Sequence, residues 1–326
     1  MKATSIANSN TAFIKYWGKY NEELIIPMNS NMSLTVDSQN TVTTVEFSGD
    51  YKEDEVILNS SRAEGKERER VTRHLDLVRG LAKIRDRAKV VSKNNFPTAA
   101  GLASSASGFA ALTVAACAAA GLNLDKKRLS IIARQGSGSS CRSIYGGYVQ
   151  WLKGKTSDDS YAVQIADENY FDIRDIAVVV STGERAISSR EGMRLSIKTS
   201  PIYQARLGVV EGMLEKVKKA ILARDFRTLG STAEADAILM HSVMMTTEPH
   251  LFYWEPKTLE LLKKIMKWRS EGLECYFTVD TGPNVHIFCL PDKEKEILSR
   301  LKEEGFRNFF ASKPGGGAEL LKKHLF

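Results

Sequence analysis

Residues that build metal centres and disulfide frameworks are scarce in this sequence. Of 326 residues only four are cysteines (Cys117, Cys141, Cys275 and Cys289), and no two of them have metal-ligand spacing or form a C-x-x-C pair. The five histidines are scattered, without an H-x-x-x-H pattern. This scarcity argues against a zinc site and against a disulfide-stapled secreted domain. It predicts buried free thiols in a reducing, cytoplasmic environment.

Long apolar runs are also missing. Residues 1–10 have neither the hydrophobic core nor the cleavage pattern of a signal peptide. The longest stretch without charge, residues 99–124, is rich in alanine, serine and glycine and lacks the charge-flanked, aromatic-belted ends of a membrane span. A buried helix behind a polar loop explains this stretch better, so we expect no membrane partner.

Charge of one sign is not concentrated in blocks. The chain has 46 basic and 39 acidic residues, a net charge of +7 and a pI of about 9.1. Segments 65–87 and 257–267 mix both signs, which is typical of solvated helix faces. The basic balance suits an anionic small substrate, and no nucleic-acid-binding motif accompanies it. We expect no nucleic-acid partner.

Two common nucleotide-binding motifs are absent. Gly154-Lys155-Thr156 would need a glycine at position 149 to complete a P-loop, but Val149 stands there. The segment 136–138 begins like a dinucleotide fingerprint, but Cys141 occupies the place of its last small residue. A P-loop NTPase and a Rossmann dehydrogenase are therefore excluded.

Hydrophobic periodicity predicts an α+β chain. Alternating residues near the N-terminus indicate strands, and apolar residues spaced by three and four over 68–87 indicate an amphipathic helix. The second half follows a helix-helix-strand-turn-strand-helix order, which favours a compact α+β lobe. We predict a boundary near residue 185, with lobes 1–185 and 186–326. Strands are predicted at 2–7, 32–36, 41–47, 89–92, 148–151, 176–180, 274–279 and 284–289, and helices at 68–87, 106–120, 129–135, 200–221, 228–244, 257–270 and 293–304.

Small residues dominate the segment Pro97–Gly108, whose sequence is P-T-A-A-G-L-A-S-S-A-S-G. Its glycines let the backbone curl close to a ligand, and the helix that follows gathers free amide groups and the positive end of its dipole. Such a helix start binds phosphate, and the hydroxyls of Ser104 and Ser105 add donors and a candidate metal ligand. A serine-capped, alanine-rich core helix explains the composition equally well.

Two charged residues stand in glycine-rich frames. Arg142 lies within Gly136–Tyr148, where its planar guanidinium suits a bidentate carboxylate and Ser139 and Ser140 add donors. We expect Arg142 to contact a ligand rather than solvent. Asp280 follows an apolar strand and opens a Gly-Pro turn, a position that by itself favours an Asx-turn residue over a catalytic one.

Four blocks together resemble the GHMP kinase superfamily and, within it, the diphosphomevalonate decarboxylase branch. Pro97–Gly108 resembles the phosphate-binding loop, and Lys15–Lys19 with the following stretch to Ser33 resembles the N-terminal signature. Gly136–Tyr148 resembles the Ser/Arg substrate loop, and Asp280–Asn284 resembles the D-x-G-P-N turn. The resemblance spans the chain and implies a two-lobed GHMP kinase fold, with a ribosomal S5 domain 2-like first lobe and a ferredoxin-like second lobe.

The same resemblance implies an enzyme of isoprenoid synthesis, commonly a homodimer, that uses ATP and Mg²⁺ to decarboxylate mevalonate 5-diphosphate to isopentenyl diphosphate. It implies that Asp280 faces the substrate's tertiary hydroxyl, that Lys15 lies beside Asp280, and that Arg142 completes the catalytic set. The implied substrate contacts are Asn10, Tyr16, Lys19, Ser139, Ser140 and Arg142. The implied ATP contacts are Ser92, Asn94, Pro97, Gly101, Leu102, Ala103, Ser104, Ser105, Ser189 and Met193, with Ser105 also at the metal.

Departures from the branch leave alternatives open. Tyr20 stands where a basic residue is usual, Arg190 replaces a small hydroxyl residue, and Thr11 replaces a more apolar one. Related decarboxylases act on mevalonate 5-phosphate with ATP, or on mevalonate 3,5-bisphosphate without it, giving isopentenyl phosphate. A non-catalytic binding module of the superfamily is disfavoured, because every candidate catalytic residue is present.

Overall fold

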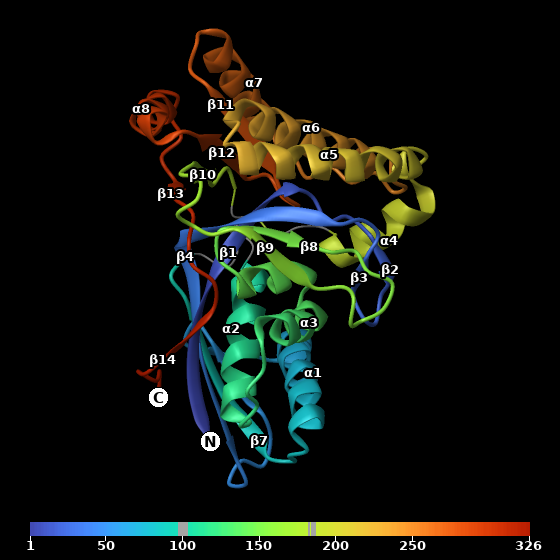
Figure 1. Ribbon diagram of the computed structural model, residues 1–326, viewed down its shortest axis with the longest axis vertical. Helices are drawn as coiled ribbons and strands as arrows, with labels where there is room; N and C mark the ends of the chain where they lie inside the picture. The colour runs from blue at the N-terminus through green and yellow to red at the C-terminus, as the bar shows by residue number, and fades with distance from the viewer. Residues whose placement is uncertain (97–103, 182, 184–186) are drawn as a thin grey trace.

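The computed structural model folds the chain into two lobes, each a sheet with helices packed against it (Figure 1). It describes residues 1–96, 104–181, 183 and 187–326. The blue-to-green half of the chain forms one lobe and the yellow-to-red half the other, while the last residues return to the first lobe (Figure 1). The α+β character predicted from the sequence is therefore confirmed.

Two long antiparallel strands, β1 (Lys2–Ile14) and β4 (Asn31–Ser48), form the spine of the first sheet. Their register shifts between Asn8 and Asn10 and again between Ala12 and Ile14, and such bulges bend a strand and re-aim its side chains. In the described residues the sheet has eight strands in the order β14-β1-β4-β7-β5-β6, with β8 joined to β4 and β9 to β8. The other strands of this lobe are β2 (Lys19–Asn21), β3 (Ile26–Pro27), β5 (Glu55–Leu58), β6 (Ser61–Arg62), β7 (Arg87–Asn94), β8 (Tyr148–Trp151), β9 (Ala162–Ala166) and β14 (Glu319–Leu321).

An alanine-rich helix, α2 (Ser104–Ala119), packs directly on β1 and β4. Ala110 and Ala115 are fully buried, and their small side chains let helix and sheet approach closely. This is the buried helix that the sequence predicts for the uncharged stretch. Within the part of the chain that the structure describes, no helix has the length and apolarity that a membrane crossing needs. The lobe also contains α1 (Gly65–Ala82), α3 (Lys126–Gly136) and a 3-10 helix (Gly138–Ile144).

The second lobe has the β-α-β-β-α-β order of a ferredoxin-like fold. Its described strands lie in the order β11-β12-β10-β13, and all of their pairings are antiparallel. Leu261 of α7 and Leu301 of α8 share one buried cluster with Phe277 and Ile287 of the sheet. The elements are β10 (Arg174–Val178), β11 (Cys275–Val279), β12 (Val285–Cys289), β13 (Phe309–Ser312), α4 (Ser189–Thr199), α5 (Tyr203–Ala223), α6 (Phe226–Met245), α7 (Pro256–Ser270) and α8 (Glu294–Glu303).

The two lobes share a hydrophobic core at the end of β1. Phe13 of β1 and Phe288 of β12 pack with ring centroids 5.0 Å apart, and Leu214 of α5 and Leu229 of α6 belong to the same buried cluster. The residues that follow β1 are therefore held between both lobes, which is where the polar residues singled out in the sequence converge.

Most predicted helices and strands are confirmed, and the differences are local. The strands predicted at 32–36 and 41–47 are a single strand, β4, and the glycine-rich loop after α3 contains a 3-10 helix. The sequence analysis did not predict α4 or the strands β2, β3, β5, β6, β9, β13 and β14, and each of these strands spans at most five residues. The boundary at residue 185 stays a prediction, since β10 precedes it in the second sheet and β14 returns to β1.

Candidate active site

A buried lysine and a partly exposed aspartate form an ion pair where the lobes meet. Lys15 follows β1 in the first lobe and Asp280 follows β11 in the second. Lys15 Nζ lies 2.6 Å from Asp280 Oδ1, and the side chains are 2% and 29% exposed. The structure thus brings together two predicted catalytic residues from opposite ends of the chain. Asp280 also shapes its turn, because its carbonyl accepts a hydrogen bond from the N–H of Gly282 at 2.9 Å.

Opposing effects set the pKa of Asp280. Burial raises it, but the charge of Lys15, the charge of His286, the hydrogen bond from Lys15 and the charge of Arg142 outweigh burial and lower this pKa to about 2. The carboxylate is therefore ionised at neutral pH. It can accept a hydrogen bond from a substrate hydroxyl, but a group with so low a pKa is a weak base.

A second, fully buried ion pair anchors the main chain of Lys15. Its N–H donates to Asp236 Oδ2 at 2.6 Å, and its carbonyl accepts a hydrogen bond from Arg206 at 3.0 Å. Arg206 and Asp236 also pair with each other at 2.9 Å, with both side chains 0% exposed. The sequence analysis did not identify Asp236 or Arg206. An aspartate in the midst of apolar residues on α6 is the signal that could have found this site.

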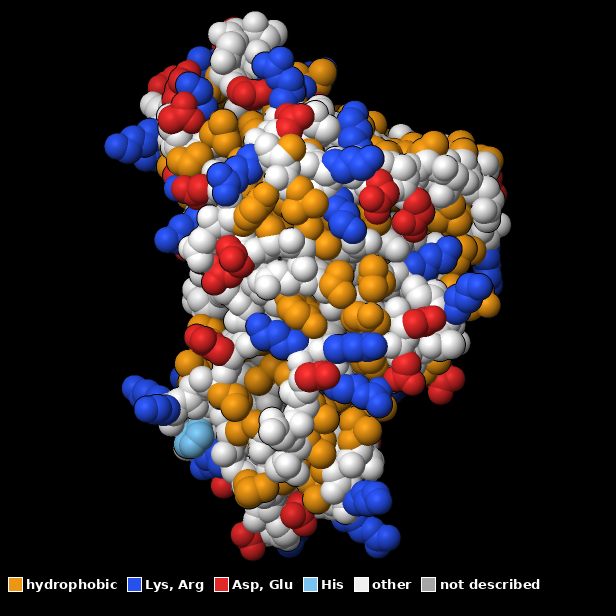
Figure 2. Space-filling view, in the orientation of Figure 1, with side chains coloured by type: hydrophobic (Ala, Val, Ile, Leu, Met, Phe, Trp, Pro, Cys, Tyr) orange, Lys and Arg blue, Asp and Glu red, His pale blue; other side chains and the backbone are white. Residues whose placement is uncertain are grey.

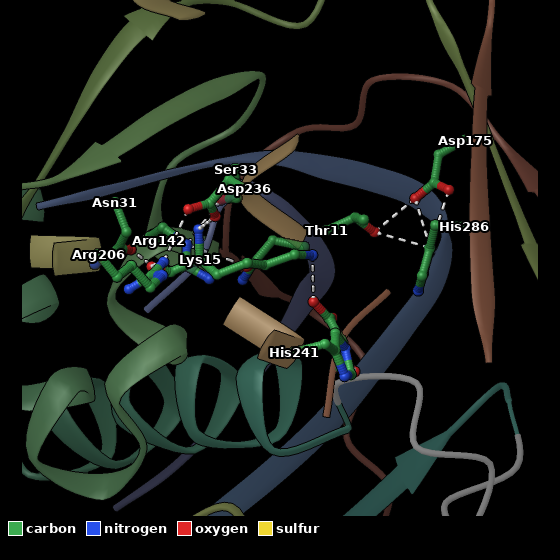
Figure 3. Close-up of polar contacts among 12 residues, drawn as sticks. Thr11, Lys15, Asn31, Ser33, Arg142, Asp175, Arg206, Asp236, His241 and His286 are labelled. Carbon is green, nitrogen blue, oxygen red and sulfur yellow. Dashed lines mark hydrogen bonds and ion pairs between the residues drawn. The ribbon is translucent and has the colours of Figure 1, made fainter. Parts of the chain in front are cut away.

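Arg142 lies in a network of neutral oxygen atoms (Figure 3). It donates to Asn10 Oδ1 at 2.9 Å, to Ser33 Oγ at 2.9 Å and to Asn31 Oδ1. Its side chain is buried, and burial lowers its pKa. In the described part of the chain no carboxylate lies within ion-pair distance of it. Asp280 acts on its charge from farther away, so that charge is only partly compensated. A buried, unpaired guanidinium favours an anionic ligand.

The other predicted substrate contacts differ in whether their polar atoms already have hydrogen-bond partners. The hydroxyl of Ser140 is buried and donates to the carbonyls of Ala133 and Ser137, so this residue supports the 3-10 helix. The hydroxyl of Tyr16 is buried and has no partner among the described residues, and burial raises its pKa above the usual range. Ser139 is half-buried on the same 3-10 helix as Ser140.

Lys19 and Asn10 complete that set. Lys19 lies on β2, where its buried ammonium pairs with the exposed carboxylate of Glu22. Asn10 lies on β1 beside the first bulge, accepts from Arg142 and donates to Ser143 Oγ at 2.7 Å. Trp17, next to Tyr16, is fully buried in the core. These contacts hold the site together but do not by themselves test the predicted roles.

A further buried cluster joins β1 to the second sheet (Figure 3). Thr11 donates to Asp175 Oδ2 at 2.5 Å, and His286 Nδ1 lies 3.0 Å from Asp175 Oδ1. Burial lowers the pKa of His286, but the charge and hydrogen bond of Asp175 outweigh it, and the net result is a raised pKa. The sequence showed Thr11 only as a departure from the branch and did not identify the other two residues.

A pocket of about 140 Å³ lies among β7, α1 and α2. Three predicted ATP contacts line it together, namely Ser92, Asn94 and Ser105. Its apolar wall suits an aromatic base, and its hydroxyl and amide groups suit a ribose or a base edge. The remaining lining residues are Thr43, Leu58, Asn59, Glu67, Arg70, Val71, Val90, Gly108, Phe109 and Leu112. The predicted contacts Pro97, Gly101, Leu102 and Ala103, and the side chain of Ser104, lie outside the described residues.

Two arginines add positive charge at this end of the site. Arg70 lies over the ring of Phe109, 5.0 Å from its centroid, and its Nε is buried without a partner in the described structure. Burial and then the charge of Arg190 lower the pKa of Arg70. Arg190 donates to the carbonyl of Gly136 at 3.2 Å. Like charges held near one another favour an anionic ligand, and the sequence had marked only Arg190.

The two remaining ATP contacts predicted from the sequence lie on α4. Ser189 is its first residue, and Met193 is buried in a cluster with Trp17. Neither is among the residues that line the described part of the pocket. Their roles therefore stay predictions.

The oxygen atoms near the pocket are suitable ligands for a magnesium ion that is coordinated mainly by phosphate oxygens. Among the described residues no group of three His, Cys, Asp or Glu side chains could hold a metal. Ser105 is half-buried, and its hydroxyl accepts a hydrogen bond from Ser137 at 3.2 Å. Mg²⁺ is usually held by one or two protein oxygens together with phosphates and water, so a single hydroxyl is consistent with the predicted metal contact.

Comparison with protein families identifies both lobes. Residues 7–162 match the model of the diphosphomevalonate decarboxylase-like N-terminal domain. Residues 176–313 match the mevalonate 5-diphosphate decarboxylase C-terminal domain. The diphosphomevalonate decarboxylase of Ganoderma lucidum is 36% identical over 321 residues, which cover 91% of this chain and 80% of that protein.

Solved structures agree over nearly the whole chain. A structure described as MDDEF in complex with MVAPP, AMPPCP and magnesium is 43% identical, with a TM-score of 0.94 and 99% of both chains covered. The mevalonate diphosphate decarboxylase of Enterococcus faecalis, described in terms of mevalonate diphosphate mediated ATP binding, is 41% identical, with a TM-score of 0.93 and 99% of both chains covered. These likenesses confirm the expected two-lobed GHMP kinase fold. The chain belongs to the diphosphomevalonate decarboxylase family.

Proposed function

We propose that this protein decarboxylates mevalonate 5-diphosphate with ATP, giving isopentenyl diphosphate, ADP, phosphate and CO₂. The observation that carries the proposal is the Lys15–Asp280 pair at the lobe junction, beside Arg142, whose charge is only partly compensated. The family, and relatives described with MVAPP, AMPPCP and magnesium, support this substrate and these cofactors.

Each group of the substrate has a matching group in the site. Asp280 accepts a hydrogen bond from the tertiary hydroxyl, and Arg142 binds the carboxylate in place of the missing ion-pair partner. Arg70 and Arg190 supply positive charge for the diphosphate, and the unpartnered hydroxyl of Tyr16 offers it a donor. The substrate is thereby oriented between both lobes.

The chemistry then needs mostly orientation and charge neutralisation. ATP supplies the phosphoryl group, and Ser105 would offer a hydroxyl ligand to the Mg²⁺ ion that would neutralise the phosphates of ATP. Because the pKa of Asp280 is about 2, its carboxylate orients the substrate hydroxyl rather than deprotonating it in advance. Asp280 receives the hydroxyl proton only as the substrate oxygen forms its bond to phosphorus. Lys15 neutralises charge at the same point. The C–O bond to the new phosphate then breaks, and the electron pair released with CO₂ forms the alkene.

We further propose a cytoplasmic homodimer. All four cysteines are buried and free, which fits a reducing compartment. The family resemblance supports the dimer, and sedimentation of the purified protein tests it. A monomer across the working concentration range would contradict this part of the proposal.

The deciding experiment supplies the purified protein with mevalonate 5-diphosphate, mevalonate 5-phosphate or mevalonate 3,5-bisphosphate, each with and without ATP and Mg²⁺. We expect CO₂ and ADP in equal amounts from the 5-diphosphate and only with ATP. Faster turnover of the 5-phosphate, or CO₂ from the bisphosphate without ATP, would assign the protein to one of the variant decarboxylases. Nucleotide binding without turnover of any of the three would instead favour a non-catalytic relative.

A further inference from the structure

One helix of the second lobe contacts the main chain of both members of the Lys15–Asp280 pair. Asp236 and His241 lie on α6, little more than one helical turn apart. Asp236 accepts the N–H of Lys15 at 2.6 Å, and His241 Nε2 lies 3.2 Å from the carbonyl oxygen of Asp280. Both contacts involve backbone atoms, so they fix the backbone positions from which the side chains of Lys15 and Asp280 extend.

We propose that Asp236 and His241 are positioning residues, and that α6 is the shared template that fixes the distance between Lys15 and Asp280. The proposal rests on the decarboxylase reaction proposed above and adds the means by which its two central groups are aligned. Neither positioning residue needs to touch the substrate.

His241 serves as a neutral hydrogen-bond donor. Its side chain is 1% exposed, and burial and then the charge of Lys15 lower its pKa to about 4. A neutral imidazole carries one proton, and the carbonyl of Asp280 can only accept. The proton therefore lies on Nε2, which leaves Nδ1 without a partner among the described residues.

The ring of His241 is also fixed in orientation. It packs on Trp254 with ring centroids 4.7 Å apart and an interplanar angle of 37°. The Asp280 carbonyl receives a second hydrogen bond from Gly282 N–H at 2.9 Å, which closes the turn. His241, on α6, thus braces the turn that presents the Asp280 carboxylate.

Lys15 is held from α6 by Asp236 and from the neighbouring α5 by Arg206. Asp236 holds its N–H, while Arg206, paired with Asp236, holds its carbonyl. Replacing Asp236 would also break this buried ion pair and endanger the fold. His241 is therefore the better residue on which to test the proposal.

The test compares His241→Phe, which keeps the ring against Trp254 but cannot donate, with His241→Gln, whose amide nitrogen can reach the place of Nε2. Because phosphoryl transfer depends on alignment, we expect kcat of H241F to fall about 10- to 100-fold, with KM values for both substrates little changed. H241Q should recover most of this loss. Ser242→Ala is the control, since the Ser242 hydroxyl donates a hydrogen bond to the carbonyl of Ile238 on the same helix.

Two further readouts separate positioning from a general loss of structure. If Asp280 drifts from Lys15, burial continues to raise its pKa while the opposing charge weakens, so the acid limb of kcat should move to higher pH in H241F and not in H241Q. A crystal structure of H241F should show a longer separation between Lys15 Nζ and Asp280 Oδ1 than in the wild type.

The outcomes distinguish this proposal from the proposed function. An inactive wild type combined with a longer Lys15–Asp280 separation in H241F would reject the decarboxylase assignment and support positioning. An active wild type that H241F matches in kcat and pH profile would reject positioning. A folded H241Q as impaired as H241F would also reject it, because the hydrogen bond would then not be the cause.

Discussion

The substrate end and the nucleotide end of the site are built differently. At the substrate end, Lys15 and Arg142 are buried and held by ion pairs and hydrogen bonds from both lobes. At the nucleotide end, Ser92 and Ser105 line an open pocket with an apolar wall, and their hydroxyls bond to other hydroxyls. The first arrangement fixes an ion pair and a buried guanidinium in advance, whereas the second offers shape, hydroxyl groups and the charge of Arg70 at its wall.

This difference indicates where catalysis and where binding should be sensitive. Charged groups that are already aligned stabilise a transition state without reorganisation, so changes at the substrate end should lower kcat or the kcat/KM for mevalonate 5-diphosphate. A hydroxyl-lined pocket contributes mainly to binding, so changes there should raise KM for ATP. The following variants test that contrast from the largest expected effect to the smallest.

The largest effect is expected for Asp280→Asn. The amide keeps the shape but loses the charge that Lys15 and the substrate hydroxyl require, so kcat should fall on the order of 10³-fold. Steady-state CO₂ release measures this, and calorimetry should show unchanged nucleotide binding. The surface variant Asp292→Asn is the control, and retention of full activity by D280N would refute the role given to Asp280.

Lys15→Met should produce the next largest loss, of about 10²-fold or more in kcat. It should also change the pH profile, because the pKa of Asp280 is held at about 2 chiefly by Lys15 against the upward effect of burial. In the wild-type enzyme, Asp280 becomes protonated, and the activity that depends on its charge is lost, only as the pH falls through about 2.

In K15M that acid limb should move to higher pH, from about 2 toward the ordinary aspartate value of about 3.9, because burial still raises the pKa of Asp280 while the charge of Lys15 is gone. The substrate phosphates titrate equally in both proteins, so the difference between the two profiles reports Asp280. The exposed Lys267→Met is the control. Superimposable wild-type and K15M profiles would contradict the electrostatic coupling.

Arg142→Gln should lower kcat/KM about 100-fold. Glutamine can still bond to the neighbouring amides, but it cannot pair with a carboxylate. Isothermal calorimetry with mevalonate 5-diphosphate should show the weakened binding, and the exposed Arg194→Gln should bind normally. Unchanged affinity in R142Q would mean that the substrate carboxylate lies elsewhere.

The smallest effect is expected at the nucleotide end. Ser92→Ala removes a hydroxyl whose partner Thr43 is 2.9 Å away, so KM for ATP should rise about 3- to 10-fold with kcat unchanged. Ser231→Ala, on the exposed surface, is the control. A loss of kcat in S92A as large as in K15M would erase the contrast between the two ends.

The sequence predicts the two ends unequally well. Lys15, Arg142 and Asp280 lie in short motifs, and the structure places Lys15 and Asp280 in direct contact with Arg142 close by. The supports of these residues are not predictable in the same way. Asp236 and His241 belong to an ordinary helix, and they matter only because folding brings α6 against residues far away in the sequence.

Two residues show that a motif does not predict the hydrogen-bond partner of each side chain within it. Ser140 looks like a ligand donor in the sequence, yet its hydroxyl bonds to carbonyls of its own lobe. Thr11 looks like a simple departure from the branch, yet it donates to the buried Asp175. The partner of Thr11 is set by tertiary packing, which local sequence does not encode, whereas Ser140 is engaged by carbonyls only three and seven residues before it.

A structure of the protein with mevalonate 5-diphosphate and a non-hydrolysable ATP analogue tests the central claim most directly. The claim predicts that the tertiary hydroxyl lies within hydrogen-bond distance of the Asp280 carboxylate, about 2.6–3.2 Å. The carboxylate of the substrate should contact Arg142, and the nucleoside should lie against Ser92 and Asn94. A substrate bound with its hydroxyl turned away from Asp280 would contradict the account.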